Sequence, residues 1–210
     1  MYTGIVQEQL PILTIDKKDG MSTFSVAFPD DLLADLQTGA SVAINGVCFT
    51  VTRINNGEVT FDAIRETLEL SNIRFLEVGT MVNVERSAKP TAEVGGHVLS
   101  GHVIDTALVS EVETSENNCR MTFNGDGSWL KYVFNKGFLA VNGASLTVAA
   151  LDRDASTFSI NLIPETLKRT NFSRLQKGDE VNIEIESQTQ VIVDTVERVM
   201  AERYSPANTS

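Results

Sequence analysis

The sequence predicts an all-β protein that consists of two similar small β-barrels followed by a C-terminal α-helix. Two observations lead to the barrels: the chain repeats itself, and each copy consists of short Val- and Thr-rich runs separated by turn residues. One observation leads to the helix, because the apolar residues near the C-terminus follow a helical spacing.

The duplication extends over most of the chain. The matching segments are 3–6 with 100–103, 45–51 with 142–148, 66–68 with 165–167, and 82–85 with 181–184. They follow in the same order at a nearly constant offset, and chance similarity would not keep this register. We therefore expect two domain-sized units, residues 1–94 and residues 95–186, with Gly95-Gly96 marking the connector between them.

Each unit is expected to fold into about six short strands. Asn45-Gly46 and its counterpart Asn142-Gly143 lie between Val- and Thr-rich runs, where an Asn-Gly pair predicts a tight hairpin. Such strands fit a small closed barrel or a sandwich, and we favour the barrel because closure leaves no unpaired edge. Further strands are expected at residues 59–64, 81–86, 157–162 and 180–185, and short helices are expected to start near Pro29 and Pro164.

The segment 187–204 is expected to be a helix with no counterpart between the two units. Ser187 and Gln190 fit a capping box, and Ile192, Val196 and Val199 fall on one helical face. This apolar face could cover the protein's own barrel or pack against copies of itself, and the sequence favours neither. Residues 205–210 are expected to be a disordered tail.

The composition argues against several classes of function. A net charge of −11 disfavours nucleic-acid binding, because the chain and a phosphate backbone repel each other. No apolar run approaches the roughly 20 residues that span a membrane, and the N-terminus lacks the features of a signal peptide. Cys48 and Cys119 match no metal-ligand spacing. We expect a cytoplasmic protein with no metal, no membrane contact and no nucleic-acid partner.

The two copies differ where they carry reactive groups. Cys48 of the first copy corresponds to Ser145 of the second, and Ile5 corresponds to His102. The alignment therefore expects a thiol in one barrel, and a hydroxyl and an imidazole in the other. Such a pair suits a reaction that treats two like molecules differently. The threonines repeat in two matched pairs, Thr50 with Thr147 and Thr67 with Thr166. β-Propensity explains any single one of them, but matched pairs favour a binding site in each barrel.

These residues resemble the riboflavin synthase family over nearly the whole chain. The resemblance rests on Gly4-Ile5-Val6-Gln7, the turn before Cys48, the Gly- and His-rich segment 95–102 and the two Glu-Thr-Leu runs. It implies that each half is a six-stranded Greek-key barrel that binds one 6,7-dimethyl-8-ribityllumazine. It implies a transferase that moves a four-carbon unit between two such molecules, giving riboflavin and 5-amino-6-ribitylamino-uracil. No cofactor is expected, because the electron-poor lumazine ring can stabilise its own carbanion.

The resemblance also implies an assembly. The family forms a homotrimer through its C-terminal helices, and each active site lies between the N-terminal barrel of one subunit and the C-terminal barrel of a neighbour. Lumazine synthase is a further candidate partner.

The resemblance assigns candidate site residues in both halves. Cys48, or a water that it orients, is the candidate nucleophile, and His102 is the candidate proton carrier. Ser145 and Thr147 would support the partner ring. Lys136 resembles a family lysine that reaches a ligand in the adjoining subunit, and an ordinary solvated lysine is the alternative. The residues expected to contact substrate are Gly4, Ile5, Val6, Cys48, Phe49, Thr50, Asp62, Ala63, Ile64, Arg65, Glu66, Thr67, Gly101, His102, Val103, Lys136, Ser145, Leu146, Thr147, Asn161, Leu162, Ile163, Pro164, Glu165 and Thr166.

Two positions depart from the family pattern. Tyr2 stands where the family usually has Phe, and its added hydroxyl needs a hydrogen-bond partner. Asn142 stands where the family usually has Asp. This change would slow the reaction if the carboxylate moves protons, and would be neutral if the residue only shapes the turn.

The chief alternative function is a non-catalytic antenna protein that binds lumazine or flavin on the same fold. Such proteins typically lose pocket residues in one half, whereas this chain keeps Cys48, His102 and Ser145, so the enzyme is favoured. An unrelated transport or regulatory module built from two barrels is the third interpretation.

Overall fold

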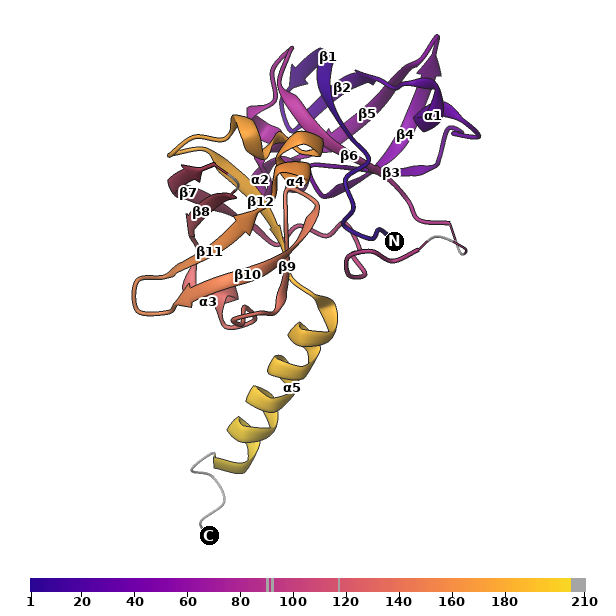
Figure 1. The fold of residues 1–210 in the computed structure, drawn as a ribbon. Coiled ribbons are helices and arrows are strands. Elements are labelled where there is room, and N and C mark those ends of the chain that lie inside the picture. The colour runs from indigo at the N-terminus through magenta and orange to yellow at the C-terminus, as the bar shows by residue number, and fades with distance from the viewer. Residues whose placement is uncertain (90, 92, 117, 205–210) are drawn as a thin grey trace.

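Two barrels side by side and one projecting helix make up the protein (Figure 1). The structure is a computed structural model that describes residues 1–204 except 90, 92 and 117. The tail expected at residues 205–210 lies outside the described residues.

Each barrel is closed, six-stranded and antiparallel, which confirms the predicted fold class. The first barrel contains β1 (Glu8–Lys18), β2 (Met21–Ala27), α1 (Asp30–Leu33), β3 (Ser41–Ile44), β4 (Val47–Asn55), β5 (Glu58–Ile64), α2 (Arg65–Leu70), η1 (Asn72–Phe75) and β6 (Met81–Arg86). The second contains β7 (Asp105–Ser115), β8 (Asn118–Asn124), α3 (Gly127–Leu130), β9 (Phe138–Val141), β10 (Ala144–Asp152), β11 (Thr157–Leu162), α4 (Pro164–Arg169), η2 (Asn171–Arg174) and β12 (Glu180–Glu184).

The strand order is the same in both barrels. Around the first it is β1-β2-β5-β4-β3-β6, and the second follows with β7-β8-β11-β10-β9-β12. The order is not sequential, because β2 pairs with β5 while the β3–β4 hairpin closes the barrel against β6, as in a Greek key. The predicted hairpin turns form at both places: Asn45 and Gly46 have φ of 46° and 83°, and Asn142 and Gly143 have 44° and 79°.

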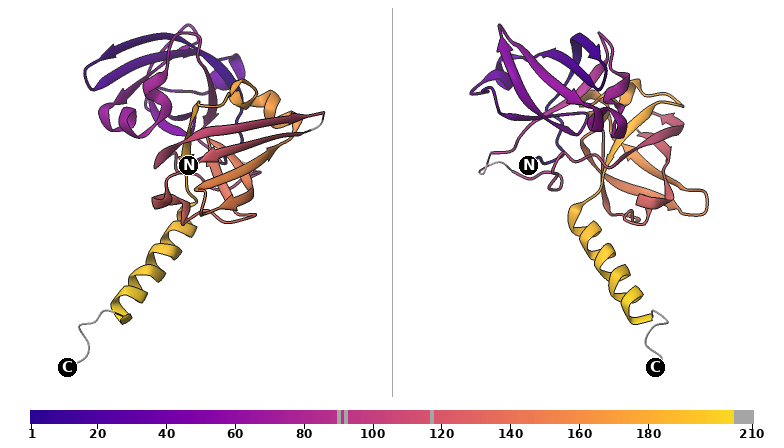
Figure 2. Two further views of the ribbon diagram at one scale, coloured as in Figure 1. Left: turned by 90° about the vertical axis from the view of Figure 1, so that its left-hand side faces the viewer. Right: turned by 180° about the vertical axis from the view of Figure 1, so that it is seen from behind.

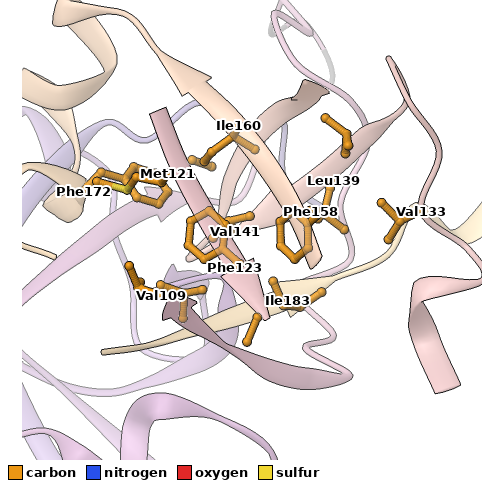
Figure 3. Close-up of a cluster of buried hydrophobic side chains, with 14 of the residues drawn as sticks. Val109, Met121, Phe123, Val133, Leu139, Val141, Phe158, Ile160, Phe172 and Ile183 are labelled. Atoms are coloured by element: carbon orange, nitrogen blue, oxygen red, sulfur yellow. The ribbon is translucent and has the colours of Figure 1, made fainter. Parts of the chain in front are cut away.

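Both barrels are filled by apolar side chains. In the second barrel, Phe123 and Phe158 stack with ring centroids 5.0 Å apart, surrounded by aliphatic side chains from all sides of the barrel (Figure 3). In the first barrel, Phe24 packs edge-on against Phe49. Small barrels are normally filled in this way. A ligand therefore has to bind to the outer wall of a barrel rather than inside it.

The two barrels are joined by a buried network of asparagine side chains. Asn83 Nδ2 donates to the carbonyl of Asn142 over 2.9 Å, and Asn182 Nδ2 donates to the carbonyl of Asn45 over 2.8 Å. The two hairpin turns meet back to back, because a Cβ added to Gly46 would lie 2.7 Å from the backbone nitrogen of Gly143. Only glycine permits this approach together with the positive φ.

Asn142 belongs to this network. Its Oδ1 accepts from the backbone N–H of Asn182 over 2.8 Å and from Asn72 Nδ2 over 3.0 Å. The side chain is almost fully buried between the barrels. Of the two alternatives for this position, the geometry supports the one in which the residue shapes the turn.

The C-terminal helix α5 (Ser187–Tyr204) projects away from both barrels in all three views (Figures 1 and 2). The helix begins at Ser187 itself. The residue before the helix is therefore Glu186, and not Ser187 as the predicted capping box requires. Its polar side contacts the second barrel, since Tyr132 Oη donates to Asp194 over 2.6 Å and Lys131 Nζ to Glu197 over 2.6 Å.

The apolar side of α5 stays open. Val191 is 64% exposed and Ile192 63% exposed, and Val196 and Met200 are also exposed. Of the two alternatives for the apolar face, covering its own barrel is therefore not the arrangement found in this chain. Within the described residues, no helix is both long and apolar enough to cross a bilayer.

Candidate functional site

Each copy of the repeat begins with a segment that reaches across to the other barrel. The carbonyl of Gly4 accepts the backbone N–H of Ser145 over 2.8 Å, and the carbonyl of Gly101 accepts that of Cys48 over 3.0 Å. Both glycines have positive φ, and a Cβ on either would lie within 2.6 Å of the Cβ of Ser145 or Cys48. The approach needs glycine at both positions.

A buried glutamate ties each of these segments to the last strand of its own copy. Glu85 accepts the backbone N–H of Thr3 over 2.7 Å and that of Gly4 over 3.0 Å. Glu184 accepts those of Ser100 over 2.7 Å and Gly101 over 3.1 Å. Carboxylates that accept several backbone N–H groups hold a segment firmly. Each barrel thus presents its leading segment to the pocket of the other barrel.

The first pocket, here named the thiol pocket, has a volume of about 250 Å³. It lies between the start of β4, helix α2 and the crossing segment of the second copy. Its lining residues are Val47, Cys48, Glu66, Thr67, Leu70, Ser71, Gly101, His102 and Val103. The Cys48 thiol and the His102 side chain are both exposed in it.

The second pocket, the hydroxyl pocket, has a volume of about 270 Å³ and the matching position in the second barrel. Its lining residues are Gly4, Ile5, Val6, Ala144, Ser145, Leu146, Glu165, Thr166, Arg169 and Thr170. Arg169 forms an ion pair with Glu165 along α4, whereas the matching position in the thiol pocket is Leu70.

The structure corrects one expectation about these groups. The sequence alignment expected His102 beside Ser145, in the barrel without the thiol. Because the leading segments cross, His102 instead lies with Cys48, and Ile5 lies with Ser145. The thiol and the imidazole therefore share one pocket.

Behind Cys48 lies Tyr2. Its hydroxyl donates to Cys48 Sγ over 3.0 Å, and the side chain is 1% exposed. Burial raises the pKa of the Tyr2 phenol far above its usual range, and the neighbouring Cys48 adds to this effect. The phenol therefore keeps its proton. The hydroxyl that the sequence left without a partner has one in the thiol pocket.

Behind Ser145 lies His97. Its Nδ1 is 2.6 Å from Ser145 Oγ, and its ring stacks on Phe138 with centroids 5.3 Å apart. His97 is 6% exposed, and its Nε2 has no hydrogen-bond partner among the described residues. Burial lowers the pKa of His97 below its ordinary value, although Glu186 and Glu184 act in the opposite direction. The imidazole is therefore neutral at neutral pH.

Most of the other expected substrate contacts lie on the outer walls beside these pockets. Side chains alternate along the strands, so Thr50 and Thr147 point outward with Cys48 and Ser145. Exposed residues near the pockets on the neighbouring strands and at their ends are Asp62, Ile64, Arg65, Asn161, Ile163 and Pro164.

Four of the expected contacts lie elsewhere. The side chains of Phe49, Ala63 and Leu162 point into the barrel cores, which leaves only their backbone groups for a ligand. Lys136 is exposed in the turn before β9 with a φ of 65°, and it lines neither pocket of its own chain.

The sequence pattern alone did not assign Tyr2 or His97 to the site. Tyr2 was noted only as a departure from the family, and a single histidine is more often structural than catalytic. Arg169 was also missed, although its mismatch with Leu70 in the repeat could have indicated it.

Within the described residues, no group of three His, Cys, Asp or Glu side chains is placed to hold a metal ion. The chemistry that the arrangement offers is that of a thiol and an imidazole in one pocket and a hydroxyl, backed by the buried His97, in the other.

The comparisons with known proteins agree with this duplicated arrangement. The family described as "Lumazine binding domain" matches the chain twice, over residues 3–87 and residues 100–186. The riboflavin synthase of Escherichia coli (strain K12) is 48% identical over 209 residues, which covers 99% of this chain and 97% of that protein. The riboflavin synthase of Chlamydia pneumoniae is 39% identical over 201 residues, covering 96% and 98%.

Solved structures share the fold. A structure of LumP complexed with riboflavin has a TM-score of 0.81 and 28% sequence identity, and the match covers 89% of this chain and 100% of that chain. LumP complexed with 6,7-dimethyl-8-(1'-D-ribityl) lumazine has a TM-score of 0.80 and 27% identity, covering 89% and 99%.

Proposed function

The chain belongs to the riboflavin synthase family, and from this we infer that it catalyses the dismutation of two 6,7-dimethyl-8-ribityllumazine molecules. One lumazine gives a four-carbon unit to the other, and the products are riboflavin and 5-amino-6-ribitylamino-uracil. Together the two products contain all the atoms of the two substrates, so the reaction consumes no oxidant, reductant or water.

One observation carries the proposal: the chain has two pockets of similar size and origin that hold unlike reactive groups. Pockets of about 250 and 270 Å³ built on the same scaffold suit two copies of one heterocycle. The thiol pocket holds Cys48 and His102, whereas the hydroxyl pocket holds Ser145. Two identical substrates that have to become donor and acceptor need surroundings that differ in this way.

The thiol pocket is proposed to activate one lumazine. Cys48, or a water that it orients, adds to C7 of this ring and leaves again later in the reaction. His102 moves protons to and from the acidic 7-methyl group. The carbanion that forms is delocalised into the ring. Ser145 and Thr147 hold the second lumazine, and much of the rate gain comes from bringing the two rings together in a productive orientation.

The active site is proposed to form between subunits. Both pockets lie on outer walls and leave apolar side chains open beside them, with Ile64 58% and Ile163 61% exposed. A thiol pocket of one subunit facing a hydroxyl pocket of a neighbour would cover these side chains and stack the two rings. Lys136, which lies outside both pockets of its own chain, would then reach a ligand held by the neighbour.

The exposed apolar face of α5 supports a homotrimer in which the helices of three subunits pack together. Uncovered Val191, Ile192 and Val196 side chains would be buried in such a contact. Association with lumazine synthase, a cytoplasmic location and the division of the chain into residues 1–94, 95–186 and 187–204 stay predictions.

The test is turnover on a single substrate. Purified protein given only 6,7-dimethyl-8-ribityllumazine should produce riboflavin, measured by its visible absorbance and by chromatography, with an equimolar second product. Binding of lumazine, measured by fluorescence titration, with no turnover would instead support the antenna protein. The retained Cys48, His102 and Ser145 favour the enzyme over this alternative.

A further inference from the structure

The Tyr2 hydroxyl is a buried polar group that the proposed mechanism does not use. We propose that Tyr2 is a positioning residue, whose hydroxyl holds Cys48 Sγ at the floor of the thiol pocket and stabilises its thiolate. For its effect on turnover, this inference rests on the proposed function. The effect of Tyr2 on the reactivity of the thiol does not depend on that function.

The Tyr2 phenol is fixed in place. The backbone of Tyr2 forms a two-way bridge with Leu99, with N···O distances of 2.8 and 3.0 Å. Its ring packs in a small apolar cluster with Ala43, Leu99 and Ala140, directly behind the pockets. Ala43 is the cross-strand partner of Cys48. A ring held in this way keeps its hydroxyl 3.0 Å from Sγ without having to be reorganised when the thiol reacts.

The direction of the hydrogen bond follows from the chemistry of the phenol. Because burial and Cys48 raise the pKa of Tyr2, the hydroxyl remains protonated and donates its hydrogen to sulfur. A thiol sulfur is a weak acceptor, whereas a thiolate is a strong one. The bond therefore strengthens when Cys48 ionises, and a bond that favours the charged form favours the nucleophile.

Other charged groups surround this pair. Glu66 and His102 line the thiol pocket beside Cys48, and Glu85 and Glu184 lie behind Tyr2. The two buried glutamates already accept backbone N–H groups of the crossing segments, and a negative charge on them opposes a thiolate. Within the described residues, Tyr2 is the only side chain that hydrogen-bonds Sγ.

The second copy lacks this arrangement. Leu99 occupies the position that corresponds to Tyr2, and an aliphatic side chain offers no donor. Ser145 instead has the neutral His97 behind it. The phenol therefore supplies a hydrogen-bond donor to the thiol pocket, and its counterpart Leu99 supplies none to the hydroxyl pocket.

The experiment compares the full-length chain with Tyr2→Phe, which keeps the buried ring and removes only the hydroxyl. Alkylation of Cys48 by iodoacetamide is followed by mass spectrometry across a range of pH. We expect the Tyr2→Phe rate at about pH 7 to fall roughly tenfold, and the midpoint of the pH profile to move to higher pH. Riboflavin binding, measured by fluorescence, should change by less than about twofold, because the pocket keeps its shape.

Two controls define the background. Cys48→Ser reports any alkylation at the buried Cys119, and Tyr132→Phe removes a phenol hydroxyl far from Cys48. The pH profile of alkylation in Tyr132→Phe, including its midpoint, should be the same as in the wild type. In a folded Tyr2→Phe protein, an unchanged profile, or a slower rate at every pH with the same midpoint, would overturn the proposal. Alkylation needs no lumazine, so a protein without synthase activity could still pass this test.

Discussion

The thiol pocket and the hydroxyl pocket show what a duplicated domain keeps and what it changes. Both have the same strand order around them, the same glycine in the crossing segment and the same glutamate that ties this segment down. They differ in the groups that face a ligand and in the groups behind them. Duplication has thus kept the backbone frame, which fixes the shape of the pockets, and has varied the side chains, which fix their chemistry.

The side chains behind the reactive groups also differ between the two pockets. Tyr2 provides a hydrogen-bond donor to a thiol that is exposed next to His102. His97 provides a neutral imidazole to Ser145, because its burial disfavours the protonated form. One pocket suits the formation of charge, whereas the other suits the holding of a neutral ring by hydrogen bonds.

The largest expected effect comes from making the two pockets alike. Cys48→Ser should lower the rate of riboflavin formation by ~100-fold or more, because a hydroxyl supplies far less nucleophile than a thiol. His102→Gln should lower the rate by at least ~100-fold, since it removes the proposed proton carrier. Binding of lumazine should change much less in both variants, as measured by fluorescence titration beside steady-state kinetics.

The reverse change tests the same comparison from the other side. Ser145→Cys places a thiol in the hydroxyl pocket and should lower turnover less than ~10-fold, because Ser145 is proposed to hold a ring rather than to attack it. If Ser145→Cys and Cys48→Ser had equal effects, or if neither Cys48→Ser nor His102→Gln affected the rate, the assigned roles would be wrong.

A second, smaller effect should reveal the crossing of the leading segments. Glu184→Gln should loosen residues 100–103 and so disturb the thiol pocket, whereas Glu85→Gln should loosen residues 3–6 and disturb the hydroxyl pocket. An amide can accept these N–H groups at only one of its ends, so the loss is roughly 1–3 kcal/mol in local stability. Amide hydrogen exchange read by mass spectrometry would show it. Each variant is the control for the other. Faster exchange of the Cys48 N–H in Glu85→Gln, or of the Ser145 N–H in Glu184→Gln, would contradict the crossed arrangement.

The smallest expected effect concerns pH. His97 has a lowered pKa in the folded protein, so the unfolded chain binds a proton below about pH 6.5 that the folded chain does not. The free energy of unfolding should therefore fall as the pH decreases from about 6.5 towards the lower pKa of the folded state. The loss from this residue is at most about 1.4 kcal/mol per pH unit.

His97→Asn should remove this contribution while its amide keeps a hydrogen bond to Ser145. Urea unfolding of wild type and His97→Asn at several pH values measures the difference, and His102→Asn serves as the exposed control. Parallel pH dependences in wild type and His97→Asn would show that burial does not keep His97 neutral.

The local and repeated features of this protein could be predicted from the residues alone. The duplication, the Asn-Gly hairpins and the Val- and Thr-rich runs predicted two small barrels, because each of these signals is visible along the chain without knowing which segments meet in space. The match of Cys48 with Ser145 in turn predicted two related pockets with unlike groups. The helix at residues 187–204 followed from its own periodicity.

Which groups share a pocket depends on contacts between segments that are distant along the chain. The alignment put His102 with Ser145, but the hydrogen bonds between Gly101 and Cys48 and between Gly4 and Ser145 exchange the two leading segments. A crossed and an uncrossed arrangement have the same local pattern of residues, so no periodicity distinguishes them. The partners of Tyr2 and His97 likewise come from parts of the chain that lie close together only after folding.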